Sequence, residues 1–157
     1  MIITQSMLVK RGACVSGIND FLKMFPSGHV RVTLRTALEH ADEIDWYFVL
    51  SRLVPGFSAN RYHNVANEFH NTARKMYRLL HDVHGFPLRC RTCRRTIDEV
   101  NDMINRCFAE LAARLILYPE LRDPSTQVKL RSYRDPATLL TCHHVQAHVR
   151  KHGNVTP

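Results

Sequence analysis

Cysteine and histidine residues that could bind a metal ion gather in two segments of this chain. Cys90 and Cys93 form a CxxC pair, and Cys142 and His144 belong to a histidine-rich segment near the end. Two thiolates of such a pair, joined by two further sulfur or nitrogen ligands, would form the tetrahedral shell that Zn²⁺ prefers. A single CxxC pair is a weak signal, however, and the second segment lacks standard zinc-finger spacing. Two readings therefore stay open, a structural zinc site and two reduced cysteines without metal, and the second is favoured.

A histidine followed by an aspartate, His81-Asp82, suggests a second kind of metal chemistry. The pair resembles the motif of HD-type metal phosphohydrolases, which also need a histidine upstream and an aspartate downstream. The residues available for those places are His40, His63, Asp102 and Asp135. Chance alone accounts for one such dipeptide in a chain with ten histidines. The sequence contains no motif for a phosphate-binding loop or a serine nucleophile. We therefore expect no enzyme, and the hydrolase is the least favoured alternative.

Lysine and arginine outnumber the acidic residues by 22 to 14, and the formal net charge is +8. A charge of this sign favours anionic partners, and it excludes a protein that imitates DNA through a dense negative surface. The basic residues recur on three segments, and a tyrosine among the last of them could stack on a base. The candidate binding residues are Arg74, Lys75, Arg78, Arg89, Arg91, Arg94, Arg95, Lys129, Arg131, Tyr133 and Arg134.

Apolar residues recur at three- and four-residue steps in two long segments, which predicts two amphipathic helices. The first runs from about Ser58 to His84, where a glycine and a proline follow. The second runs from Thr96 to about Tyr118. Thr96 and Glu99 form a capping box there, with acidic residues in the first turn. Because few residues connect the two helices, we expect them to pair as an antiparallel helical hairpin.

Shorter elements are expected in the first third of the chain. The expected helices are Gln5–Lys10, Gly17–Met24, Thr36–Ala41 and Glu43–Leu53, with an extended segment at His29–Thr33. After Pro119 a polar, basic linker leads to a short histidine-rich helix. We thus expect a mainly α fold, a small helical domain with a long antiparallel helix pair and a minor β segment. Its expected parts are an N-terminal module (1–55), the hairpin (56–120) and the linker with the last helix (121–157).

A series of short motifs runs through the first third of the chain. They are Ala13-Cys14, Gly17-Ile18 with Phe21, Phe25-Pro26-Ser27-Gly28, Val32-Thr33 and Ile44-Asp45-Trp46. The series resembles a module of small phage and prophage accessory proteins. The resemblance implies a phage or mobile-element origin and supplies no catalytic residue. Read from the residues themselves, Cys14, Phe21, Phe25 and Trp46 predict a compact small core, and a docking surface is the alternative.

These features together predict a non-enzymatic phage-type accessory protein. We expect it to bind and inhibit a host or defence complex that handles nucleic acid, as an anti-CRISPR-like or host-takeover inhibitor. Direct binding to DNA or RNA is the alternative. No run approaches the roughly 20 apolar residues that span a bilayer, and a signal-peptide pattern is absent from the start. We therefore expect the cytoplasm of a bacterial host cell, no membrane partner, and no cofactor apart from the zinc considered above.

Overall fold

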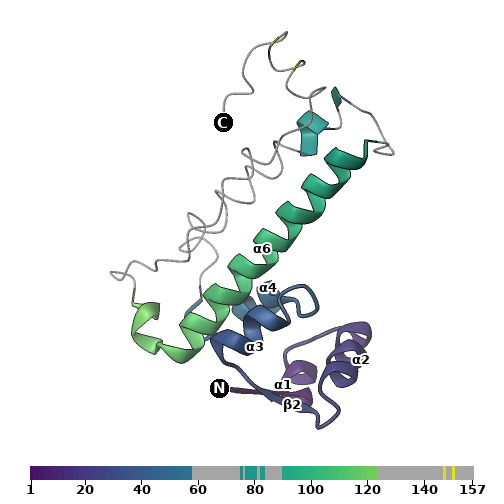
Figure 1. Ribbon diagram of the computed structural model, residues 1–157. Coiled ribbons are helices and arrows are strands. Elements are labelled where there is room, and N and C mark those ends of the chain that lie inside the picture. Colours follow the sequence, from purple (N-terminus) through teal and green to yellow (C-terminus); the bar gives the residue numbers. More distant parts are fainter. Residues whose placement is uncertain are drawn as a thin grey trace. The chain divides into compact units, whose positions relative to one another are not determined.

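The computed structural model describes residues 1–57, 75, 77–80, 82–83, 90–123, 147 and 150. It confirms a mainly α fold (Figure 1). In chain order its elements are β1 (Ile2–Thr4), α1 (Gln5–Lys10), α2 (Val15–Met24), β2 (His29–Arg31), α3 (Leu34–Glu39), α4 (Trp46–Phe48), the π-helix η1 (Val49–Leu53), α6 (Arg91–Leu117) and the 3₁₀ helix η2 (Pro119–Arg122). Within the described residues, none of these helices has the length and apolar character needed to cross a bilayer.

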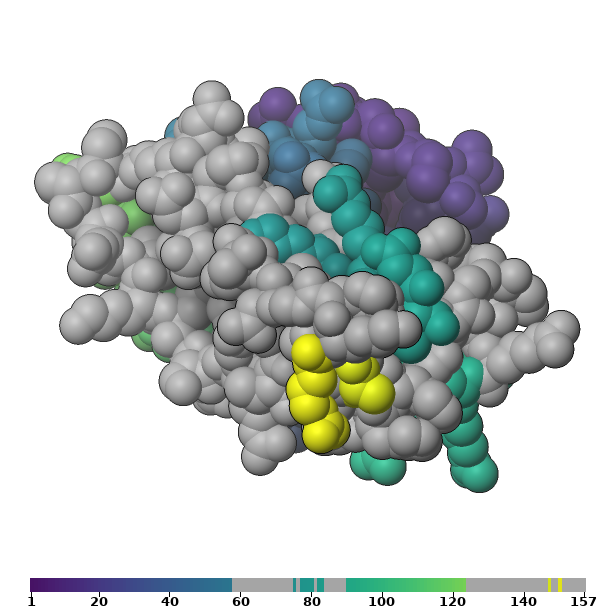
Figure 2. Space-filling model, turned by 90° about the horizontal axis from the view of Figure 1, so that it is seen from above, coloured from purple at the N-terminus to yellow at the C-terminus, as the bar shows by residue number. Residues whose placement is uncertain are grey.

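The chain divides into two compact units. Unit 1 comprises Met1–Arg61 and Asn105–Arg131, and unit 2 comprises Tyr62–Ile104 and Ser132–Pro157. Helix α6 contributes residues to both units, because the division falls within it. Most of the atoms of the first residues of unit 1 that are visible in Figure 2, purple to blue, lie together.

The two short strands of unit 1 pair antiparallel. Ile3 lies opposite Val30 in the register, and its side chain is buried. Gly28 precedes β2 with a φ of 71°, and its carbonyl accepts a hydrogen bond from the backbone N–H of Gln5 at 3.0 Å. The extended segment near residue 29 was predictable, but its partner β1 was not. A strand of three residues is too short to show an alternating pattern.

Side-chain caps determine where the short helices begin. The capping oxygens and sulfur accept hydrogen bonds from backbone N–H groups in the pairs Thr4–Met7 (3.2 Å), Cys14–Gly17 (3.4 Å), Thr33–Thr36 (3.0 Å) and Asp45–Phe48 (2.9 Å). Such caps satisfy donors that the first turn of a helix leaves without an intrahelical partner. The expected bounds of α1 are confirmed. Helices α2 and α3 each begin two residues earlier than expected, directly after their caps, and α4 begins three residues later.

Four aromatic rings connect α2, α3 and α4 in unit 1. The rings of Phe21 and Phe25 lie 5.2 Å apart, and Phe25 meets the ring of His40 edge to face at 5.0 Å. The buried indole of Trp46 donates a hydrogen bond to the carbonyl of His40 at 3.0 Å. This part of the expected small core is confirmed. Cys14 does not belong to it, because the side chain that caps α2 must stay at the exposed helix start.

The start of α6 differs from the expectation. The helix begins at Arg91 and not at Thr96, since the backbone N–H of Arg94 already donates to the carbonyl of Cys90 at 3.0 Å. Thr96 does not cap the helix. Its hydroxyl donates to the carbonyl of Thr92, one turn back, at 3.0 Å. The predicted capping box is therefore wrong, and the first turn of α6 contains arginine and no acidic residue.

One segment of α6 in unit 1 is buried on every side. Five consecutive residues, Ala109–Ala113, have no exposed surface. One of them is acidic: the carboxylate of Glu110 accepts a hydrogen bond from Nε of Arg114 at 2.8 Å and forms an ion pair with Nη2 of the same guanidinium at 2.7 Å. The sequence predicted burial of one apolar face only, whereas this segment of the helix is buried on all faces. Three of these buried residues are alanines, whose small side chains let neighbouring segments pack close to the helix backbone.

In unit 2 the N-terminal half of α6 packs against residues of the first expected long helix. Leu79 and Leu80 form an apolar cluster with Cys93 and Val100 of α6. The hydroxyl of Tyr77 also donates a hydrogen bond to Asn101 of α6. Residues 75, 77–80 and 82–83 are helical, as expected. The expected start at Ser58, the end at His84 and the bounds of the last helix lie outside the described residues.

We predict that Gly28→Ala lowers the free energy of unfolding by about 1 kcal/mol, because a side chain at positive φ is strained. A Cβ there meets no neighbour closer than 3.9 Å, so backbone strain is the cause of the loss. Gly17→Ala is the matched control. Gly17 lies in the first turn of α2, and its new methyl group would make an ordinary contact of 3.4 Å with the Cys14 sulfur. Urea unfolding should show a loss for the first variant and no loss for the second.

Candidate functional site

The start of α6 carries three exposed arginines. Arg91, Arg94 and Arg95 are spaced by three and four residues, so they share one face of the helix. Buried Cys93 and Val100 lie on the opposite face. Arg95 pairs with Glu99 at 2.9 Å, and its side chain remains 81% exposed. We call Arg91, Arg94 and Arg95 the arginine face.

The helix end makes this face unusual in electrostatic terms. The N-terminus of a helix carries the positive end of its dipole, and acidic side chains are the stabilising choice there. In α6 the first turn has no acidic residue, and its charges have the same sign as the dipole. An anion bound at this turn would interact favourably with both the guanidinium groups and the helix end. The expectation placed these arginines in a loop between helices, whereas the structure places them on the helix itself.

Of the other predicted binding residues, the structure describes two. Lys75 and Arg78 are exposed and helical in unit 2. The remaining six lie outside the described residues: Arg74, Arg89, Lys129, Arg131, Tyr133 and Arg134. The structure therefore brings together Arg91, Arg94 and Arg95 of the predicted set.

Of the four predicted metal ligands, the structure likewise describes two. Cys93 has no exposed surface and packs in the apolar cluster of unit 2, and half-buried Cys90 packs against the same cluster. Cys142 and His144 lie outside the described residues. In the part of the chain that the structure describes, no three metal-ligating side chains converge. Zinc binding stays a prediction.

The HD-type alternative cannot be assembled from described residues alone. Asp82 and Asp102 belong to unit 2, where Asp102 is half-buried. His40 belongs to unit 1, where its Nδ1 shares a hydrogen bond of 2.5 Å with Glu43. His63, His81 and Asp135 lie outside the described residues.

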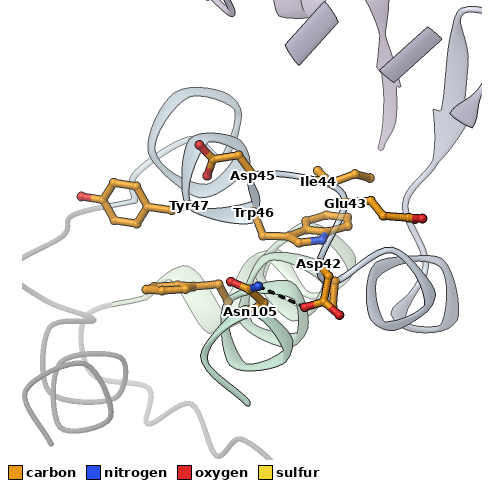
Figure 3. Close-up of a pocket in the computed structure, with 9 residues that line it drawn as sticks. Asp42, Glu43, Ile44, Asp45, Trp46, Tyr47 and Asn105 are labelled. Carbon is orange, nitrogen blue, oxygen red and sulfur yellow. Dashed lines mark hydrogen bonds between the residues drawn. The ribbon is translucent and has the colours of Figure 1, made fainter. Parts of the chain in front are cut away.

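Sequence reasoning missed a pocket in unit 1, which has a volume of about 420 Å³ (Figure 3). The loop between α3 and α4, the first residues of α4 and one face of α6 form its walls. Its lining residues are Ala41, Asp42, Glu43, Ile44, Asp45, Trp46, Tyr47, Asn105 and Phe108. The ring of Tyr47 meets the ring of Phe108 edge to face at 5.7 Å. Tyr47 is nevertheless 50% exposed.

Three exposed carboxylates stand in the pocket loop, and each is held by one hydrogen bond. Asp42 accepts from the side-chain amide of Asn105 at 3.0 Å, as Figure 3 shows. Asp45 accepts from the backbone N–H of Phe48, and Glu43 bonds His40. The signal that could have revealed this site is local. Three acids fall within four residues, directly before three aromatic residues, in a chain that is otherwise basic.

Comparison with known proteins shows no relative: no family model, no curated protein and no solved structure matches this chain. The chemistry of the described residues is therefore what bears on function.

We predict that the thiol of Cys14 reacts with iodoacetamide near neutral pH much faster than that of Cys107. The hydrogen bond from Ser16 and the backbone N–H of Gly17 lower the pKa of exposed Cys14. Burial, with Glu110 nearby, raises the pKa of Cys107 to about 12. Because the thiolate is the reactive form, Cys14 should be labelled in the folded protein and Cys107 only after unfolding.

Peptide mass spectrometry of a labelling time course would measure both rates in one sample. Ser16→Ala removes the hydrogen bond that lowers the pKa of Cys14, so labelling should slow near neutral pH and recover at higher pH. Equal labelling of Cys14 and Cys107 in the folded protein would contradict the assignment.

Proposed function

We propose that this protein is a non-enzymatic, phage-type accessory protein that binds and inhibits a host or defence complex that handles nucleic acid. The observation that carries the proposal is the arginine face at the start of α6. It sets three exposed cations on a rigid helix, at the end where a bound anion is favoured. The resemblance of the first third of the chain to phage accessory modules supports the phage setting.

The fixed geometry of the arginine face suits binding to a large anionic surface. Its opposite side is anchored by Cys93 and Val100, so the helix cannot turn without exposing apolar surface. Guanidinium groups recognise carboxylate and phosphate through paired hydrogen bonds. A complex that handles nucleic acid offers phosphate on the nucleic acid it holds, and an acidic surface of its protein offers carboxylate. Inhibition then requires only that this surface be occupied.

Direct binding to DNA or RNA is the second candidate, and the same face favours it. Arginines without a base-reading element bind phosphate with little dependence on sequence. The two candidates differ in what survives nuclease treatment, because a protein target stays bound after its nucleic acid is digested.

We predict that a pull-down from bacterial lysate retains a protein complex after nuclease treatment. The double variant Arg91→Glu/Arg94→Glu should weaken that binding about tenfold or more, since removal of interfacial arginines commonly costs over 1.4 kcal/mol. The matched control is Lys10→Glu/Arg11→Glu. It makes the same change in net charge at exposed positions of unit 1 and should leave binding unchanged.

Two other outcomes would contradict this proposal. If the retained material disappears with the nucleic acid, direct binding is the function. The logarithm of its binding constant should then fall steeply with salt, and the double variant should reduce the slope by about 2. If the Arg91→Glu/Arg94→Glu variant retains the complex as the wild type does, the arginine face is not the contact surface.

A further inference from the structure

We infer that the pocket of unit 1 is a binding site for an arginine side chain presented by a partner protein. This inference does not rest on the proposed function, because the pocket and the arginine face use different residues in different units.

The size and the wall of the pocket suit a side chain with an apolar stem. Its volume of about 420 Å³ lies in the range of small-ligand sites. Tyr47 and Phe108 provide aromatic surface, and half of Tyr47 remains exposed although it lines the pocket. Half-exposed aromatic residues of this kind are typical anchors at protein interfaces. A guanidinium group can also stack on an aromatic ring, which an ammonium group does less well.

One carboxylate of the pocket is oriented before any ligand arrives. Asn105 holds Asp42 by a hydrogen bond of 3.0 Å, whereas the side chains of Glu43 and Asp45 point in other directions (Figure 3). A carboxylate has two oxygens and about four acceptor positions, so one such bond leaves capacity for a ligand. Because the orientation already exists, binding does not have to order the Asp42 side chain. Planar, paired donors of the kind that arginine presents match such a carboxylate best.

The charge of the whole chain selects the source of the cation. The protein carries a formal charge of +8, so its long-range field repels free polyvalent cations such as polyamines. The pocket loop is a local acidic exception to that field. An arginine on a partner protein that is acidic overall would be attracted to this chain as a whole and then meet the Asp42 carboxylate at short range. We therefore assign the pocket to a partner's arginine and not to a free amine.

The single tryptophan of the chain allows a direct test, because Trp46 lines the pocket. The blocked peptide acetyl-Gly-Arg-Gly-amide would be titrated while the indole N–H signal of Trp46 is followed by NMR. We expect a saturable shift. The same peptide with citrulline, which has the shape of arginine without its charge, should bind at least about tenfold more weakly. Peptides with lysine and free spermidine should also bind more weakly.

Two variants and one control locate the site. Asp42→Asn keeps the size of the side chain and should weaken arginine-peptide binding about tenfold, and Tyr47→Ala should weaken it similarly. Asp20→Asn removes an exposed acid that pairs with Lys23 outside the pocket, and it should bind as the wild type does. An unchanged Trp46 signal in the ligand-free variants would show that the fold is retained.

The inference fails if the arginine peptide produces no saturable shift, or if citrulline binds equally well. Equal binding of lysine peptide or spermidine would overturn the assignment to arginine. Arg91→Glu/Arg94→Glu should leave this titration unchanged, so failure of the pocket and failure of the arginine face are separate results.

Discussion

The complete burial of α6 between Ala109 and Ala113 is the constraint on which unit 1 depends. A helix with no exposed side over more than one turn cannot rotate or slide without opening a cavity. Its buried carboxylate adds a second restriction, since Glu110 is tolerated there because Arg114 pairs with it at close range. Asn105 precedes this segment by about one turn, and Phe108 precedes it directly. Their positions in the pocket therefore follow from packing elsewhere on the same helix.

One helix thus provides side chains for two surfaces of opposite charge. Its first turns provide the arginine face, and its middle provides the amide and the aromatic ring that complete the acidic pocket. A protein that acts by occupying a surface benefits from rigid contact groups, because little conformational entropy is then lost on binding. Both surfaces meet this condition. Neither requires a catalytic group or a cofactor, in agreement with the class of function that we propose.

Local signals predicted much of the fold. Periodic apolar residues indicated α6, and capping residues such as Thr4 and Thr33 mark the observed starts of α1 and α3. The capping box at Thr96 was misleading, because the apolar contacts of Cys93 extend the helix by more than a turn beyond it. Burial of Glu110 could not be derived from a stripe pattern, although its spacing to Arg114 is that of an ion pair. The acidic residues before Trp46 mark one wall of the pocket in the sequence, but its closure could not be predicted, since it requires Asp42 and Asn105 to meet across a long stretch of sequence.

This separation in sequence has a consequence for how the protein is made. A ribosome adds about 5–20 residues per second, so Phe108 is synthesised roughly 3–12 s after Tyr47. During that interval the aromatic ring and the Asp42 carboxylate lack the partners that α6 supplies. A nascent chain that stalls before residue 105 exposes this unfinished surface to chaperones and proteases. The residues of the paired strands β1 and β2, by contrast, are all present once about 30 residues have emerged, long before the residues that close the pocket.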